Sequence, residues 1–339
     1  MTRPIATTHV SLLLAISATL HFLVDGLCIC SLYLLTTPFD MRWIAVVYAT
    51  YNVLAFLTQP LTGAIADRLT HRHWLLLAAV VLLALAVAAT AAATALCPQL
   101  SVATGAPPSV MAVATLLGTG NSLFHVWGGK QTAVVTANDM RALGVFVAPG
   151  VLGLSVGAVF CSWTLLYALL LAIGLLAVAY LHLDNVADSP PESITAWPVC
   201  DRHNADGQGQ AWAFVVAAVT VLMAVVLLRS YVGGAFSATL NQRHAAIIVV
   251  GIMAMAGKMA GGWLALLVGI GKAMVVAAVC TAVCLCLAPT HEVAALLGVF
   301  AINTTMPMTL YLANVVLTGR EGLTFGLLAA ALIPGYLLL

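Results

Sequence analysis

Charge is scarce in this sequence. Only 7% of its 339 residues are charged, whereas a soluble domain carries about 25%, so an ordinary soluble protein is excluded. The 12 Lys and Arg residues nearly balance the 11 Asp and Glu residues, and without a basic cluster we expect no nucleic-acid partner. The mean hydropathy is +1.10, and long Ala, Leu and Val runs lack the alternation of barrel strands. The sequence predicts an all-α polytopic membrane protein.

Enzymatic motifs are also missing. The sequence has no Gly-x-x-x-x-Gly-Lys-Ser/Thr loop for phosphate binding, so ATP-driven transport is unsupported. It shows no paired carboxylates, and its 8 cysteines and 9 histidines lack the spacing of a metal site. We therefore expect no catalytic residue, no metal and no cofactor, and we predict that the protein is not an enzyme.

Eleven apolar stretches approach the length of about 20 residues that a membrane span needs. Six precede a polar segment and five follow it: 10–36, 43–66, 74–97, 107–129, 142–161 and 163–182, then 211–236, 245–268, 273–289, 292–316 and 322–339. We predict a six-helix bundle over 1–182, a cytoplasmic linker over 183–210 and a five-helix bundle over 211–339. The linker is acidic and contains two consecutive prolines, which favours a solvated connector, with a docking segment as the alternative.

Positive residues are divided unevenly between the two sides of these spans. With the N-terminus inside, the outer segments hold only Arg42 and Arg243. The inner segments hold Arg3, Arg68, Arg72, Lys130, Arg141, Arg202, Lys272 and Arg320. Because Lys and Arg concentrate in cytoplasmic loops, we expect a multi-pass protein of the cytoplasmic (inner) membrane with its N-terminus inside.

A few charged and polar residues fall within the spans, where a charge is costly and needs a reason. His21 and Asp25 are one helical turn apart in the first span. A buried carboxylate beside an imidazole is suited to proton exchange, so we assign proton coupling to Asp25 and His21. The alternative is a structural hydrogen-bonded pair.

Two cations lie in spans of the second half. Arg229 can hold an anionic group with two hydrogen bonds, and the alternative is a permanent salt bridge, for example with Asp25. Lys258 either faces the same cavity or extends to the membrane surface. We expect further polar residues to line this cavity with them, so that the substrate-binding set is Arg229, His125, Asn121, Lys258, Asn52 and Asn303.

The order of the spans resembles the major facilitator superfamily of transporters, which has six spans, a linker and six spans around a central cavity. A twelfth span is missing from that pattern here. Between the second and third spans the sequence reads Gly63-Ala-Ile-Ala-Asp67-Arg68-Leu-Thr-His-Arg72, which resembles the superfamily's cytoplasmic signature, although Thr70 replaces its second glycine. The resemblance implies a two-bundle fold in which Gly63, Asp67, Arg68 and Arg72 act in gating. A charged loop tip, the alternative, leaves Gly63 and Asp67 unexplained.

The fifth span contains Gly144-Val-Phe-Val-Ala-Pro149-Gly150-Val-Leu-Gly153, which resembles the Gly–Pro motif of exporters in that superfamily. Proline removes a backbone donor and kinks a helix, and small residues let two helices approach closely. We assign Pro149 and Gly150 to gating, with packing alone as the alternative.

Three shorter motifs resemble the fosmidomycin-resistance-type branch of the superfamily. They are the pair His21 and Asp25 in the first span, Phe124-His125 in the fourth and Arg229-Ser230 in the seventh. Val126 stands where that branch has a proline after the histidine. The overall resemblance extends over nearly the whole chain.

We therefore expect a secondary active transporter that moves a small polar or anionic solute or drug by alternating access. Its partners would be the small-molecule substrate, protons and the lipid bilayer, and we expect a monomer. Proton coupling is expected at Asp25, and export is favoured by the resemblance of the Gly–Pro stretch. The alternatives are a proton-independent or uptake transporter of a small metabolite, and a non-transporting membrane scaffold or receptor on the same fold.

Overall fold

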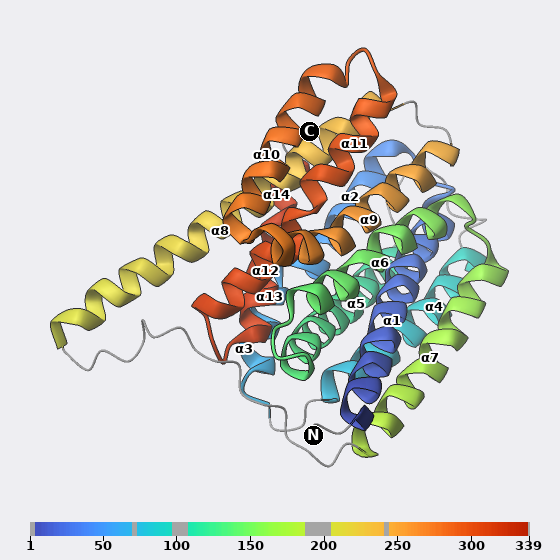
Figure 1. Cartoon of the computed structure of the whole chain (residues 1–339). Coiled ribbons are helices and arrows are strands. Elements are labelled where there is room, and N and C mark those ends of the chain that lie inside the picture. The colour runs from blue at the N-terminus through green and yellow to red at the C-terminus, as the bar shows by residue number, and fades with distance from the viewer. Residues whose placement is uncertain (1–3, 70–72, 97–107, 187–204, 241–243, 338–339) are drawn as a thin grey trace.

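The structure is a computed structural model that describes residues 4–69, 73–96, 108–186, 205–240 and 244–337. Helices account for nearly all of these residues (Figure 1). Their bounds are α1 Pro4–Thr36, α2 Met41–Asn52, the π-helix η1 Val53–Leu57, α3 Gln59–Ala66, α4 Trp74–Leu96, α5 Pro108–Val135, α6 Met140–Val159, α7 Trp163–Val186, α8 Ala205–Thr239, α9 His244–Val268, α10 Ile270–Leu287, α11 Glu292–Asn303, α12 Thr305–Val316, α13 Glu321–Ala330 and α14 Leu332–Leu337.

Ten helical segments in this described part are long and apolar enough to cross a membrane, and Glu321–Gly335 is a shorter apolar helix. They match the eleven predicted stretches, so the prediction of an all-α, multi-pass membrane protein is confirmed. Three of them consist of consecutive helices: α2, η1 and α3 form the second segment, α11 and α12 the tenth, and α13 and α14 the last.

The helices on both sides of the predicted linker extend into it. Helix α7 continues to Val186 and α8 begins at Ala205, so both ends of the predicted linker 183–210 are helical. Asp184 explains the first extension, because it is buried at the end of α7 and its carboxylate lies 2.7 Å from His73 Nε2 before α4. Residues 187–204, the middle of that linker, lie outside the described part.

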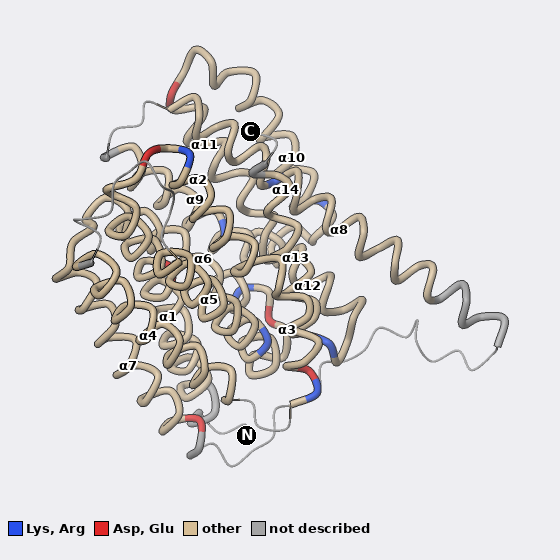
Figure 2. The backbone as a smooth tube through the Cα atoms, turned by 180° about the vertical axis from the view of Figure 1, so that it is seen from behind, with Lys and Arg blue, Asp and Glu red and all other residues tan. Residues whose placement is uncertain are grey.

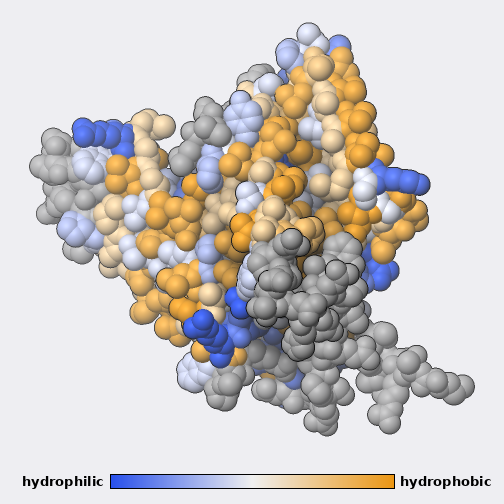
Figure 3. Space-filling model, turned by 90° about the vertical axis from the view of Figure 1, so that its left-hand side faces the viewer, coloured by the Kyte–Doolittle hydropathy of each residue, from blue (hydrophilic) through white to orange (hydrophobic). Residues whose placement is uncertain are grey.

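Large apolar side chains cover much of the outer surface, as expected for helices that face lipid (Figure 3). Leu171, Leu267 and Val275 are 65%, 83% and 62% exposed. Most charged residues lie near the ends of the helices (Figure 2). This distribution leaves the few charged side chains inside the bundle as the residues that need an explanation.

Helices of the two halves meet along two lines. Helix α6 packs against α9, and α3 packs against α13. Glycines allow the first approach, since a Cβ added at Gly144 would lie 2.6 Å from the Lys258 carbonyl oxygen, and one at Gly262 would lie 2.7 Å from that of Met140.

Candidate functional site

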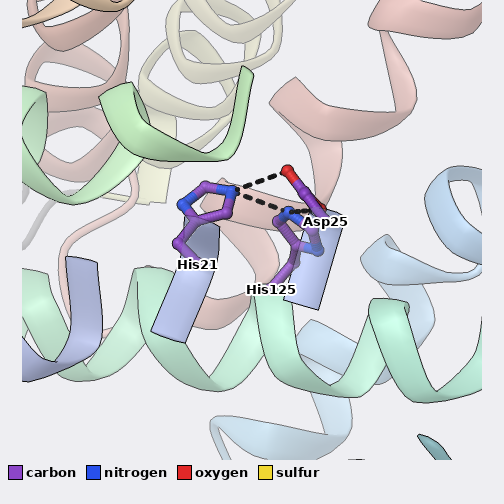
Figure 4. A group of neighbouring side chains, drawn as sticks. All are labelled: His21, Asp25 and His125. Carbon is purple, nitrogen blue, oxygen red and sulfur yellow. Dashed lines mark hydrogen bonds and ion pairs between the residues drawn. The ribbon is translucent and has the colours of Figure 1, made fainter. Parts of the chain in front are cut away.

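Three buried side chains from α1 and α5 meet in the middle of the bundle (Figure 4). The Nε2 atoms of His21 and His125 are 2.9 Å apart. Each of them also lies 3.4 Å from a carboxylate oxygen of Asp25, His21 facing Oδ2 and His125 facing Oδ1. We call these three residues the His–Asp–His cluster.

The other ring nitrogen of each histidine contacts a backbone carbonyl. His21 Nδ1 lies 2.8 Å from the Phe146 oxygen on α6, and His125 Nδ1 lies 3.0 Å from the Asn121 oxygen one turn earlier. A carbonyl oxygen only accepts hydrogen bonds, so each Nδ1 must carry a hydrogen. In neutral histidines, both Nε2 atoms are therefore bare acceptors.

Two bare acceptors at 2.9 Å repel each other unless a cation lies between them. One proton converts the contact into an N–H···N hydrogen bond of ordinary length, and the Asp25 carboxylate provides the countercharge. Asn121 Nδ2 donates to Asp25 Oδ1 over 3.1 Å and helps to orient it. The cluster is thus arranged to hold one proton among three side chains.

The cluster also contains three atoms that could coordinate a metal ion, since they all lie within 4.8 Å of one another. The spacing of histidines and cysteines along the chain predicts no metal site, whereas this cluster joins histidines that are 104 positions apart. Charge favours the proton, because a divalent ion would place two further positive charges in the membrane interior near Lys258.

Gly150 on α6 is required by this geometry. A Cβ at this position would contact Asp25 Oδ2 and His21 Nε2. Further along the same helices, Gly153 packs on the Phe22 carbonyl and Gly157 on that of Gly26. Gly150, expected from the sequence to act in gating, thus lies directly against the cluster, and Pro149 precedes it within α6.

A cavity of about 130 Å³ adjoins the cluster and lies between the two halves. Lys258 of α9 lines it together with the cluster, and its Nζ lies 3.4 Å from the Val147 carbonyl oxygen on α6. Arg229 of α8 is buried behind the lining residue Met306, whose sulfur is 2.6 Å from Nη1. The rest of the lining is Phe56, Gln59, Val147, Val151, Leu154, Met306, Leu310, Phe325, Leu328, Ala329 and Leu332.

Four predicted binding residues are not part of this described lining: Arg229 and Asn121, whose contacts are given above, and Asn52 and Asn303. Asn52 is the last residue of α2, and the π-helix that follows it changes the face that the helix presents. Asn303 donates from Nδ2 to the Val299 oxygen of its own helix at 2.8 Å. The hydroxyl groups of Thr304 and Thr305 donate to the backbone oxygens of Ala301 and Ile302 at the end of α11.

The Asp67 carboxylate joins the two halves at the end of α3. Its Oδ1 and Oδ2 accept hydrogen bonds from the backbone N–H groups of Gly322 and Leu323, both at 2.9 Å. These groups belong to the first turn of α13, where unpaired donors favour an anion. Gly63 permits the approach, since a Cβ there would contact the Gly322 carbonyl. We call this contact the Asp67 latch.

Of the basic residues of the same motif, only Arg68 is described. Arg68 is exposed beside Asp67, and Arg72 lies outside the described residues. The cation near the carboxylate is Lys130 of α5, which was expected only to mark the cytoplasmic side. Its Nζ donates to the Ala66 oxygen at 2.7 Å and lies 3.4 Å from Asp67 Oδ1.

Sequence reasoning missed a second polar contact between the halves. Asn314 Nδ2 on α12 donates to Asn138 Oδ1 at 2.8 Å, and Asn138 Nδ2 reaches the Tyr311 oxygen at 3.3 Å. Asn138 has a φ of +59° in the turn before α6, a left-handed conformation that asparagine tolerates better than most residues. A lone Asn between two spans was the only available signal.

Two solved structures share this arrangement of helices. The fucose:proton symporter of E. coli matches with a TM-score of 0.64 and 13% identity over 96% of this chain and 89% of that one. The human organic anion transporter matches with a TM-score of 0.59 and 16% identity over 95% of this chain and 92% of that one. The chain has the major facilitator fold.

No protein-family model matches the sequence, and no curated protein matches it either. At these identities the likeness to solved structures establishes the fold alone. The two matched proteins are themselves a fucose:proton symporter and an organic anion transporter. The predicted two-bundle arrangement is confirmed with the fold, and the cluster and its cavity lie at the centre of that fold.

Proposed function

We propose that this protein is a secondary transporter that couples movement of a small polar or anionic solute to protons by alternating access. The observation that supports the proposal best is the contact between the two Nε2 atoms at 2.9 Å, with Asp25 3.4 Å from each. A structural hydrogen-bonded pair would need only one histidine and the carboxylate. A second histidine facing the first provides a binding site for one proton between the two Nε2 atoms.

Movement of the two halves relative to each other would change the affinity of the His–Asp–His cluster for a proton. The cluster belongs to the N-terminal half, whereas Lys258 and Phe325, which line the cavity around it, belong to the C-terminal half. Separation of the halves would move the Lys258 charge and admit water to the cluster. Both changes alter the balance between the protonated and unprotonated forms, which is how a proton can be linked to the conformational cycle.

Other parts of the proposal rest on resemblance or on neighbours. His21, Asp25 and His125 belong to the motifs that resemble the fosmidomycin-resistance-type branch. The structural neighbours carry fucose with protons or organic anions. Export is favoured only by the resemblance of the Gly–Pro stretch, and placement in the cytoplasmic membrane with the N-terminus inside rests on the positive residues.

The test is the substitution Asp25→Asn in protein reconstituted into liposomes. A thermal-shift screen of the purified protein first identifies a solute, since ligand binding raises the apparent stability of the folded state. We expect Asp25→Asn to bind and exchange this solute but to lose accumulation driven by a pH gradient, because the amide cannot provide the countercharge for the proton. Asp40→Asn, at an exposed carboxylate that caps α2, is the matched control and should accumulate solute like the parent. Equal accumulation by Asp25→Asn would show that Asp25 is structural.

A further inference from the structure

The residues described as lining the cavity carry two opposite charges, the carboxylate of Asp25 and the ammonium group of Lys258. Asp25 is the only carboxylate among these lining residues. A proton on the cluster adds a second positive charge, so that two positive charges face one negative charge. An unbalanced charge inside the membrane is unfavourable, so the protonated site favours a ligand that brings a negative charge.

The shape and lining of the cavity limit what can supply that charge. Its volume is about 130 Å³, and the side chains between the polar ends are mainly apolar, among them Phe56, Leu310 and Phe325. A strongly hydrated inorganic ion would lose its water without replacement there. An organic body fits this lining, with its charged end at Lys258.

We propose that the solute is an organic monoanion with an apolar body, and that it crosses the membrane together with the proton. This inference rests on the proposed function and names the substrate class and the sense of coupling. Lys258 is the residue that contacts the anion.

The sense of coupling follows from the signs of the charges. An anion beside the cluster stabilises the proton on it, and the proton in turn strengthens binding of the anion by the same factor. Mutual strengthening favours the states in which both are bound or neither is bound, and these states carry both in one direction. A cation would compete with the proton and would be exchanged for it.

The groups in and around the cluster that can carry charge come from several of the helices packed there. On these described helices they are His21, Asp25 and Cys28 of α1, Tyr51 of α2, His125 of α5, Arg229 of α8 and Lys258 of α9. Asp25 is the one carboxylate in this set, so binding of an anion has to increase proton occupancy rather than displace a second acid.

The test uses benzenesulfonate as the probe, because a sulfonate stays ionised and does not cross the bilayer as a free acid. Liposomes containing the protein and a pH-sensitive dye receive an inward gradient of the probe. We expect the interior to become more acidic, without dependence on an imposed membrane potential, because one anion and one proton move together. Neutral benzenesulfonamide and cationic benzyltrimethylammonium should give no such signal.

Variants then connect the signal to the proposed contact. Lys258→Gln should weaken benzenesulfonate binding by at least about tenfold, since a charged hydrogen-bond partner is lost, and Lys258→Arg should retain most of it. Lys272→Gln, at an exposed lysine of α10, is the matched control and should bind like the parent. For the parent alone, affinity should be about tenfold higher at pH 6 than at pH 8, which tests the inference even if the glutamine variant does not fold.

Several results would overturn the inference. They are an interior that becomes more alkaline, an affinity that falls with acidification, or failure of the parent to bind benzenesulfonate. The proposed function fails separately, when Asp25→Asn retains accumulation driven by a pH gradient. Movement of protons with the neutral or cationic probe, dependent on Asp25, would leave the proposed function intact and refute the anion.

Discussion

The Asp67 latch gives the most quantitative prediction for the conformational cycle. The Asp67 side chain is only 9% exposed, and its carboxylate accepts two backbone hydrogen bonds from the first turn of α13. A hydrogen bond to a charged group contributes about 1.5–3 kcal/mol when its partner is removed. When the halves separate, water replaces both donors, so the net advantage of the closed arrangement is about 2 kcal/mol, or roughly 30-fold in population.

Asp67→Ala should therefore shift the population toward separation of α3 from α13 by about 30-fold. Spin labels at the exposed positions Leu69 and Arg320, in a variant without the 8 native cysteines, report the distance between the two halves by pulsed electron resonance. We expect the short-distance population to fall and a longer one to appear. Asp67→Asn should give an intermediate result, because one carbonyl oxygen remains to accept a hydrogen bond.

Arg68→Ala is the matched control, since Arg68 is exposed in the same turn. Its distance distribution should equal that of the parent. An unchanged distribution in Asp67→Ala would refute the reasoning that these two hydrogen bonds hold the halves together. An equal shift in Arg68→Ala would show that loss of charge in the turn, rather than loss of the two hydrogen bonds, is responsible.

Two further substitutions test the packing around the site. Gly150→Ala should lower the free energy of unfolding by about 1–3 kcal/mol and abolish pH-gradient-driven accumulation, because its Cβ contacts the cluster. Gly174→Ala is the control, since no atom lies within 4 Å of its Cβ, and it should leave stability and accumulation unchanged. Thermal unfolding measures the stability of each variant, and transport into liposomes measures its accumulation. Asn138→Ala should destabilise the protein by about 1–2 kcal/mol, whereas Asn138→Gly keeps the left-handed turn and loses only the side-chain contacts with Asn314 and the Tyr311 oxygen. Equal melting temperatures for these two variants would show that the left-handed conformation of residue 138 does not contribute to stability.

The spans could be predicted from the sequence because membrane thickness and backbone hydrogen bonding leave few choices. Their ends were less predictable. The extension of α7 to Val186 depends on the contact between Asp184 and His73, which are 111 positions apart in the chain. The apolarity of neighbouring residues does not indicate such a contact, so it predicted an earlier end for this helix.

The candidate site was predicted in its parts and not in its assembly. The i,i+4 spacing identified His21 and Asp25 as one face of a helix. His125 was assigned to the substrate, and its approach to His21 depends on how α5 packs beside α1. Asn303 had the right chemistry for the cavity, but its amide bonds to the preceding turn. Polarity within a span thus predicts involvement in the interior, whereas helix packing decides the partner.

Helix α13 connects the Asp67 latch to the His–Asp–His cluster. Asp67 holds its first turn through Gly322 and Leu323, and Phe325, two residues later, stacks on the His125 ring with centroids 6.5 Å apart. Gly129 makes room for that ring, since a Cβ there would contact it. Release of the latch would move the Phe325 ring away from His125 and admit water to the cluster. Water lowers the electrostatic cost of a charge there. In the proposed transport cycle, this one short helix would make release of the proton depend on whether the Asp67 latch is closed.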